Sequence, residues 1–183
     1  MAVRKVLRMG HPILRRPADP LDLESIGSDE TRRLIGDMIA TLHDYGGIGL
    51  AAPQVGESLR LAIAEIPESG SRYGDLPAMP LTVFFNPTIA VLDPETQGFW
   101  EGCLSVPGLR GFVERPQKIQ VDYLDIDANR QSIELSGFVA TVFQHEFDHL
   151  DGKLYIDRIS DMRLLAFEEE FMRYLAPREE PEP

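Results

Sequence analysis

The order of strand-like and helical segments is the feature of this sequence that most constrains its fold. Strand-like patterns fill the middle of the chain, at 59–66, 81–92 and 118–135, and the last of these is typical of a hairpin with a turn at 127–130. Helical patterns precede and follow these strands and do not alternate with them. Because βαβ alternation is missing, we expect an α+β fold with antiparallel or mixed strands.

Three segments have the apolar spacing that is typical of amphipathic helices. The first begins after Ser28, which can cap it, and ends at Gly46–Gly47. The second is expected over 138–150, with Gly152 near its end, and the third over 160–175. We therefore expect the strands to surround a central helix, with further helices toward the N-terminus and the C-terminus.

Length and composition indicate one folded domain. The chain has 183 residues, of which 43% are hydrophobic, which is enough for one domain with a core and short for two. We expect this domain to span 1–175, with a loop rich in Gly and Pro at 67–80. The segment 176–183 is rich in Pro and Glu, cannot bury apolar surface, and is expected to be disordered.

Charge and cysteine content restrict the environment and the partners. A formal net charge of −12 makes nucleic acid a poor partner, because phosphate binding needs clustered Lys and Arg. No segment has the apolar length of a signal peptide or a bilayer span, so we expect no membrane contact. The single cysteine, Cys103, cannot form an internal disulfide, which suits a reducing compartment such as the cytoplasm.

The stretch "FQHEFDHLDG" at 143–152 carries an HExxH motif on the expected central helix. Residues four apart on a helix lie one above the other, so His145 and His149 can present imidazole nitrogens to one ion. Glu146 lies beside the open position of such a site, where it can take a proton from water and pass it to a leaving group. The alternative is a pair of core histidines with satisfied hydrogen bonds; we predict a metal site.

A catalytic site needs a third protein ligand, and the sequence offers several candidates. The metzincin pattern fails, because Tyr155 stands where its last histidine belongs. A zinc peptidase that uses one of Glu168–Glu170 as its third ligand is an alternative, although such a run is also typical of a solvated helix face. A closed structural zinc site needs a fourth ligand, and His11 and His43 lie in other contexts. Cys103 offers a soft thiolate that suits iron or zinc.

Three blocks of the sequence together resemble the peptide deformylases. They are "GIGLAAPQVG" at 47–56, "EGCLSVP" at 101–107 and "QHEFDHL" at 144–150, in the order and at the spacing of that family. The resemblance covers nearly the whole chain except the acidic tail. Phe147 departs from the Met or Ile of many members, at a position that is not a ligand, and the 67–80 loop is longer than in the shortest members.

The resemblance implies the activity and its principal residues. A deformylase removes the formyl group from the N-terminal formylmethionine of new polypeptides and releases formate. It implies Cys103, His145 and His149 as metal ligands and Glu146 as the proton carrier. It also assigns the Gln54 side-chain amide and the Leu104 backbone N–H to the developing oxyanion.

The resemblance further implies a cofactor and partners. Fe²⁺ is the expected ion, which Zn²⁺ or another divalent metal can replace, and N-formylmethionyl nascent peptides near the ribosome are the expected partners. A methionine-specific site needs an apolar pocket, and backbone at its mouth can pair with a peptide as an added strand. The residues that we expect to contact substrate are Ile48, Gly49, Phe99, Gly102, Arg110, Phe138 and Val142.

Overall fold

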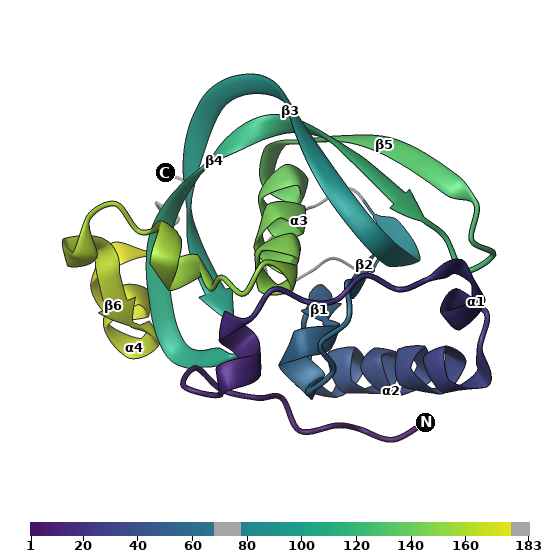
Figure 1. Cartoon of the computed structure of the whole chain (residues 1–183). Helices are drawn as coiled ribbons and strands as arrows, with labels where there is room; N and C mark the ends of the chain where they lie inside the picture. Colours follow the sequence, from purple (N-terminus) through teal and green to yellow (C-terminus); the bar gives the residue numbers. More distant parts are fainter. Residues whose placement is uncertain (68–77, 177–183) are drawn as a thin grey trace.

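The computed structural model describes residues 1–67 and 78–176, and it consists of one antiparallel sheet folded around a central helix (Figure 1). The strand order is β1-β2-β3-β4-β5, and β6 pairs with β4 at one side. The helices are α1 (Leu23–Ile26), α2 (Asp29–Tyr45), α3 (Gly137–Leu150) and α4 (Glu168–Glu170). The strands are β1 (Gly49–Ala51), β2 (Leu61–Ile66), β3 (Met79–Cys103), β4 (Val106–Leu124), β5 (Arg130–Ser136) and β6 (Leu165–Phe167). The predicted α+β class is confirmed.

The hairpin of β3 and β4 dominates the architecture and arches over α3 (Figure 1). Its strands are joined by the two residues Leu104 and Ser105, so that Cys103 pairs with Val106. Register shifts between Phe85 and Cys103 interrupt the ladder at four places, which lets such long strands bend. The sequence predicts β3 only as far as residue 92. Cys103 therefore lies at the end of β3, beside this tight turn.

The core lies on both sides of the short strands β1 and β2. On one side α3 buries Phe143 and Phe147 against Phe84, with ring centroids 5.0 and 5.8 Å from that residue. On the other side α2 buries Met38 and Leu42 completely. The first of these two apolar layers fixes α3 against the sheet and the second fixes α2, and burial of this kind is the main force that holds a helix in place.

The first two predicted helices are confirmed together with their ends. Ser28 accepts a hydrogen bond from the N–H of Thr31 at the start of α2, and Gly46 ends that helix at a φ of 64°. Beyond α3, Gly152 has a φ of 69°, and a Cβ there would lie 2.8 Å from the backbone of Arg15. Glycine at this position therefore permits both the turn and the close approach of the N-terminal segment.

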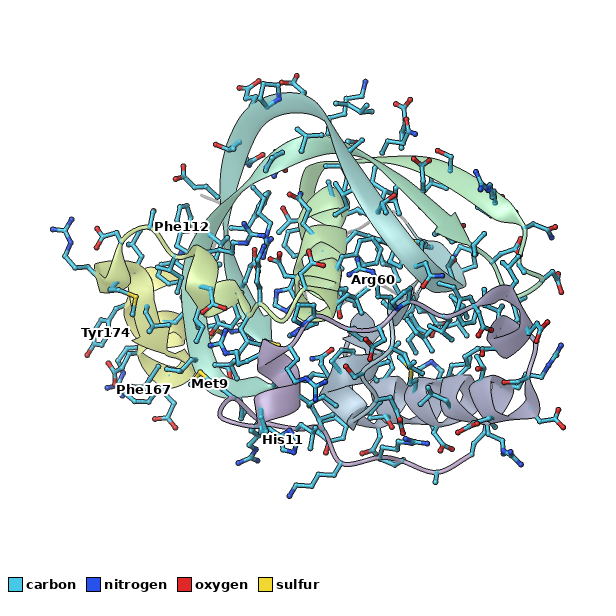
Figure 2. All side chains as sticks on the ribbon, in the orientation of Figure 1. Met9, His11, Arg60, Phe112, Phe167 and Tyr174 are labelled. Carbon is cyan, nitrogen blue, oxygen red and sulfur yellow. The ribbon has the colours of Figure 1, made fainter. Side chains whose placement is uncertain are left out.

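The prediction of one helix over 160–175 is wrong. A 3-10 turn at Met162–Leu164 leads into β6, whose residues Leu165–Phe167 pair with Leu109–Gly111 of β4. Only then follow α4 and a π-helical turn at Phe171–Leu175. The free edge of β4 offers backbone hydrogen bonds that outweigh local helical propensity. Phe167 and Tyr174 point outward from this segment and are 69% and 66% exposed (Figure 2).

The structure also bears on two smaller predictions, the hairpin at 118–135 and the loop at 67–80. The hairpin at 118–135 is confirmed, but its loop spans 125–129, because Arg130 already pairs with Leu124. Met79 and Pro80 belong to β3 and not to the predicted 67–80 loop. Residues 68–77 of that loop and the tail 177–183 lie outside the described residues. No helix among the described residues is long and apolar enough to cross a membrane.

Candidate active site

Three potential metal ligands converge where the end of β3 meets the last turns of α3. The Sγ atom of Cys103 lies 3.3 Å from Nε2 of His149. One ligand atom from each of Cys103, His145 and His149 lies within 4.8 Å of the other two. The two histidines share a helix face, and the Leu104–Ser105 turn brings Cys103 to them from a strand 42 residues earlier in the chain than His145. Within the described residues the cluster has a soft, mixed sulfur and nitrogen character that suits Zn²⁺ or Fe²⁺.

The thiol of Cys103 is electrostatically prepared for ionisation. Burial alone would raise the pKa of Cys103, but the imidazoles of His149 and His145 hold it well below its usual range. A thiolate is the form of cysteine that binds metal. The donor set therefore fits a divalent ion, with Cys103, His145 and His149 as the residues that would hold it.

A chain of buried charges fixes the orientation of His145. Its Nδ1 lies 2.7 Å from Oε2 of Glu101, so Nε2 is the nitrogen left for a ligand. Glu101 accepts two hydrogen bonds from Arg115, at 2.6 and 3.1 Å, and Arg115 also donates to Asp148 at 2.8 Å. Arg158 donates to the other side of Asp148. Sequence motifs alone did not reveal this network of buried charges, since its members lie up to 57 residues apart.

Glu146 is buried next to the three ligands and is held in place by close packing. It is 8% exposed, and its Oε2 has no hydrogen-bond partner among the described residues. Burial raises the pKa of Glu146, while the two imidazoles oppose the shift. The backbone of Gly49 in β1 passes so close that a Cβ there would lie 2.5 Å from the carboxyl carbon of Glu146. A carboxyl group with a raised pKa can both accept and donate a proton near neutral pH.

Gln54 approaches the cluster from a different element, the 3-10 helix Ala52–Val55. Its Oε1 accepts a hydrogen bond from the N–H of Ala51 at 2.8 Å, which fixes the orientation of the amide. Its Nε2 therefore faces the turn after β3, 3.2 Å from Oγ of Ser105 and 3.7 Å from Sγ of Cys103. An oriented amide donor beside the cluster is suited to stabilise negative charge that develops on a substrate oxygen.

A pocket of about 520 Å³, part of it open to solvent, leads to these groups. Ile48, Phe138 and Val142 give it apolar walls, and Gly49 and Gly102 lie at its edges. Leu104 lines it as well. All six of these were predicted to be at the site.

Phe99, the remaining aromatic candidate, is not among the residues that line this pocket. Its ring packs against Phe138, with centroids 5.1 Å apart, and Trp100 lines the pocket in its place. Successive side chains of a strand point to opposite faces, and the sequence predicts no strand here that would tell which of these two neighbours lines the pocket. Thr141 also lines the pocket and was missed, because nothing distinguishes it from a core residue of α3.

One contact accounts for Arg110 and for the first of the late glutamates, Glu168. The guanidinium of Arg110 lies over Gly102 and donates two hydrogen bonds to Glu168, at 3.1 and 2.5 Å. The alternative in which Glu168 is the third metal ligand is therefore not supported, because the cluster contains Cys103 instead. His11 caps a short N-terminal helix and His43 pairs with Glu65 at the surface, as expected for histidines outside the site.

Tyr155, the residue that excludes the metzincin pattern, stacks on His145 with ring centroids 5.9 Å apart. It is 1% exposed, and its hydroxyl has no hydrogen-bond partner among the described residues. Since a buried unpaired hydroxyl is destabilising, Tyr155→Phe should raise the free energy of unfolding by about 1 kcal/mol, measured by urea titration at fixed metal concentration. Tyr155→Leu, which removes the stacked ring, should lower it. Loss of stability in Tyr155→Phe would contradict the unpaired state of the hydroxyl.

Comparisons with known proteins agree with this geometry. The sequence model of a family described as polypeptide deformylase matches residues 3–164. A peptide deformylase of Leptospira biflexa is 42% identical over 170 residues, which are 93% of this chain and 95% of that protein. Peptide deformylase 2 of Pseudomonas syringae is 46% identical over 165 residues, 90% of this chain and 92% of that one. A Met-Ala-Ser-bound class I type b peptide deformylase from Acinetobacter baumannii superposes with a TM-score of 0.81, at 38% identity, over 86% of this chain and 99% of its own.

Proposed function

We propose specific roles for the residues of this site from the premise that the chain belongs to the peptide deformylase family, the hydrolases that remove the N-formyl group from N-terminal methionine. The observation that carries the assignment is the convergence of Cys103, His145 and His149 beside a buried carboxyl group. We take these three residues as the ligands of the metal on which the family depends. When bound, the ion would supply Lewis acidity, which would lower the pKa of water so that it can lose a proton and act as the nucleophile near neutral pH.

Glu146 carries the proton in the proposed mechanism. Its raised pKa favours uptake of a proton from the attacking water as the new C–O bond forms, and it then returns this proton to the departing amine as the C–N bond breaks. Formate and a free N-terminal amine are the products. Negative charge develops on the formyl oxygen between these steps, and the Gln54 amide and the backbone N–H of Leu104 donate hydrogen bonds to it.

The pocket provides specificity for methionine. Ile48, Phe138 and Val142 surround an unbranched apolar side chain, and Trp100 extends this wall. The edge backbone at Gly49 and Gly102 pairs with the peptide main chain, which does not discriminate among the residues that follow. The binding of Met-Ala-Ser to the deformylase of Acinetobacter baumannii supports a peptide ligand of this kind.

The remaining assignments concern the cell. We take 1–175 as the catalytic domain, Fe²⁺ as the physiological ion with Zn²⁺ as a weaker substitute, and the cytoplasm near the ribosome as the place of action. The single cysteine, needed as a free thiolate, is compatible with a reducing compartment.

The test is formate release from an N-formyl-Met peptide by anaerobically purified protein, with iron and zinc quantified on the same sample. We expect release at an iron content near one ion per chain. Cys103→Ala should lose both metal and activity, whereas Glu146→Ala should keep the metal and lose activity. An iron-loaded protein that releases no formate would overturn the proposal, and retention of metal by Cys103→Ala would overturn the ligand set.

A further inference from the structure

A second and larger cavity adjoins the methionine pocket at Gly102–Leu104, and the mechanism above does not use it. It contains about 1450 Å³ of space between atoms, part of it open to solvent. The N-terminal residues Lys5–Arg8 line one side, together with His11, which is labelled in Figure 2. The β4 residues Val106–Arg110 line the other side. We call this cavity the basic groove.

The N-terminal wall of the basic groove is bonded to the active site. The N–H of Leu7 donates to the carbonyl oxygen of Gln54 at 2.8 Å, and the N–H of Met9 donates to the carbonyl oxygen of Ser105 at 2.7 Å. These two acceptors belong to the segments that present the proposed oxyanion donors. The groove is therefore a fixed extension of the catalytic pocket and not a separate surface depression.

The charge of the basic groove is opposite to that of the whole chain. Arg4, just before it, is neutralised by ion pairs with Asp37 and Glu57. Lys5 and Arg8, by contrast, form no ion pair with any described residue. Arg110 is balanced by Glu168, which among the described residues is the one carboxylate on the groove wall. Two uncompensated cations thus stand beside the active site of a protein whose formal net charge is −12.

We propose, on the basis of the deformylase function, that the basic groove binds residues three to five of the formylated polypeptide and favours Asp and Glu at these positions. A peptide that leaves the methionine pocket in extended form advances about 3.3 Å per residue, so these residues lie roughly 7–13 Å beyond the methionine. The rest of the protein repels acidic chains, and local cations oppose this repulsion where the chain passes. Selectivity of this kind comes from charge complementarity, and it adds to the selectivity for methionine that the first pocket provides.

The experiment uses iron-loaded enzyme and matched formyl-Met peptides that carry Glu-Glu or Lys-Lys at positions three and four. We expect kcat/KM at low ionic strength to be about threefold to tenfold higher for the Glu-Glu peptide, through KM, and the ratio to approach one as salt rises. Lys5→Glu/Arg8→Glu should reverse the ratio. Arg33→Glu, an exposed charge reversal near the start of α2, should leave it unchanged.

Each outcome separates this inference from the proposed function. Equal kcat/KM for the two peptides, or a preference that persists in Lys5→Glu/Arg8→Glu, would overturn the basic groove as a binding site while the deformylase assignment stands. If neither peptide releases formate from iron-loaded protein, the proposed function fails and the inference fails with it. A salt-sensitive preference for Glu that is lost only in the groove variant supports the proposal.

Discussion

Gly49→Ala is expected to lower kcat for formyl-Met peptides by about 10²–10⁴-fold, the usual contribution of a general acid–base group. The added Cβ would lie 2.5 Å from the carboxyl carbon and Oε1 of Glu146 and 2.6 Å from its Cγ. Because these atoms end a flexible side chain, the carboxyl group moves and the backbone of β1 stays. The proton carrier is thereby displaced, although no catalytic residue has been replaced.

Three measurements distinguish this effect from general damage. Metal content and the urea unfolding midpoint of Gly49→Ala should stay close to those of the wild type, because the ligands are untouched. Gly27→Ala is the matched control, since a Cβ at Gly27 meets no atom within 4 Å, and it should retain full activity. Normal kcat in Gly49→Ala would show that Glu146 has another productive position.

Arg115→Met is expected to destabilise the protein by about 3–5 kcal/mol, the usual effect of removing one partner from a buried ion pair. Arg115 is 3% exposed and contacts two buried carboxylates, Glu101 and Asp148, which the substitution leaves without their shared cation. Burial alone would raise the pKa of Glu101, and the hydrogen bonds from His145 and Arg115 lower it. Without Arg115, Glu101 loses part of the support that keeps it ionised and able to orient His145.

The measurement is urea unfolding with metal content determined in parallel, and metal affinity is expected to fall about 10–100-fold, as for other residues that support a ligand. Arg163→Met provides the matched control, because the Arg163 side chain is 89% exposed and its pair with Asp161 is solvated. The free energy of unfolding of that variant should equal that of the wild type. An Arg115→Met protein of wild-type stability and metal affinity would contradict the structural role of the charge chain.

Predictions from the sequence succeeded where the signal is local. The two proposed ligands His145 and His149 lie four residues apart on one helix, so helix geometry alone brings them together. Likewise Ser28 and Gly46 mark the ends of α2, because capping depends on immediate neighbours. Cys103 was predicted as a ligand through the resemblance, since spacing alone left the late glutamates open.

Predictions failed where distant segments decide. Within the helical pattern predicted at 160–175, Leu165–Phe167 form β6 because an edge of β4, more than 50 residues earlier, offers them partners. Trp100 lines the pocket, whereas Phe99 was predicted to do so, because the pairing of β3 with β4 decides which side chain faces the pocket. The burial of Arg115 could not be predicted either, because nothing in its neighbours Glu114 and Pro116 indicates that this arginine is buried. Long-range pairing carries this information, and a single sequence shows it only weakly.

The two-residue turn at Leu104–Ser105 has a consequence for how the protein folds. The turn joins strands of 25 and 19 residues, and Cys103 lies beside His149 only when this hairpin and α3 are packed together as in the native structure. The ligands stand 42 and 46 residues apart in sequence, so closure of this loop opposes their meeting in the unfolded chain. The complete set of proposed ligands is therefore present only in the folded protein, so an ion that binds to it is expected to stabilise the folded state. Chelation should accordingly lower the thermal unfolding temperature, and uptake of metal during refolding reports completion of the native state.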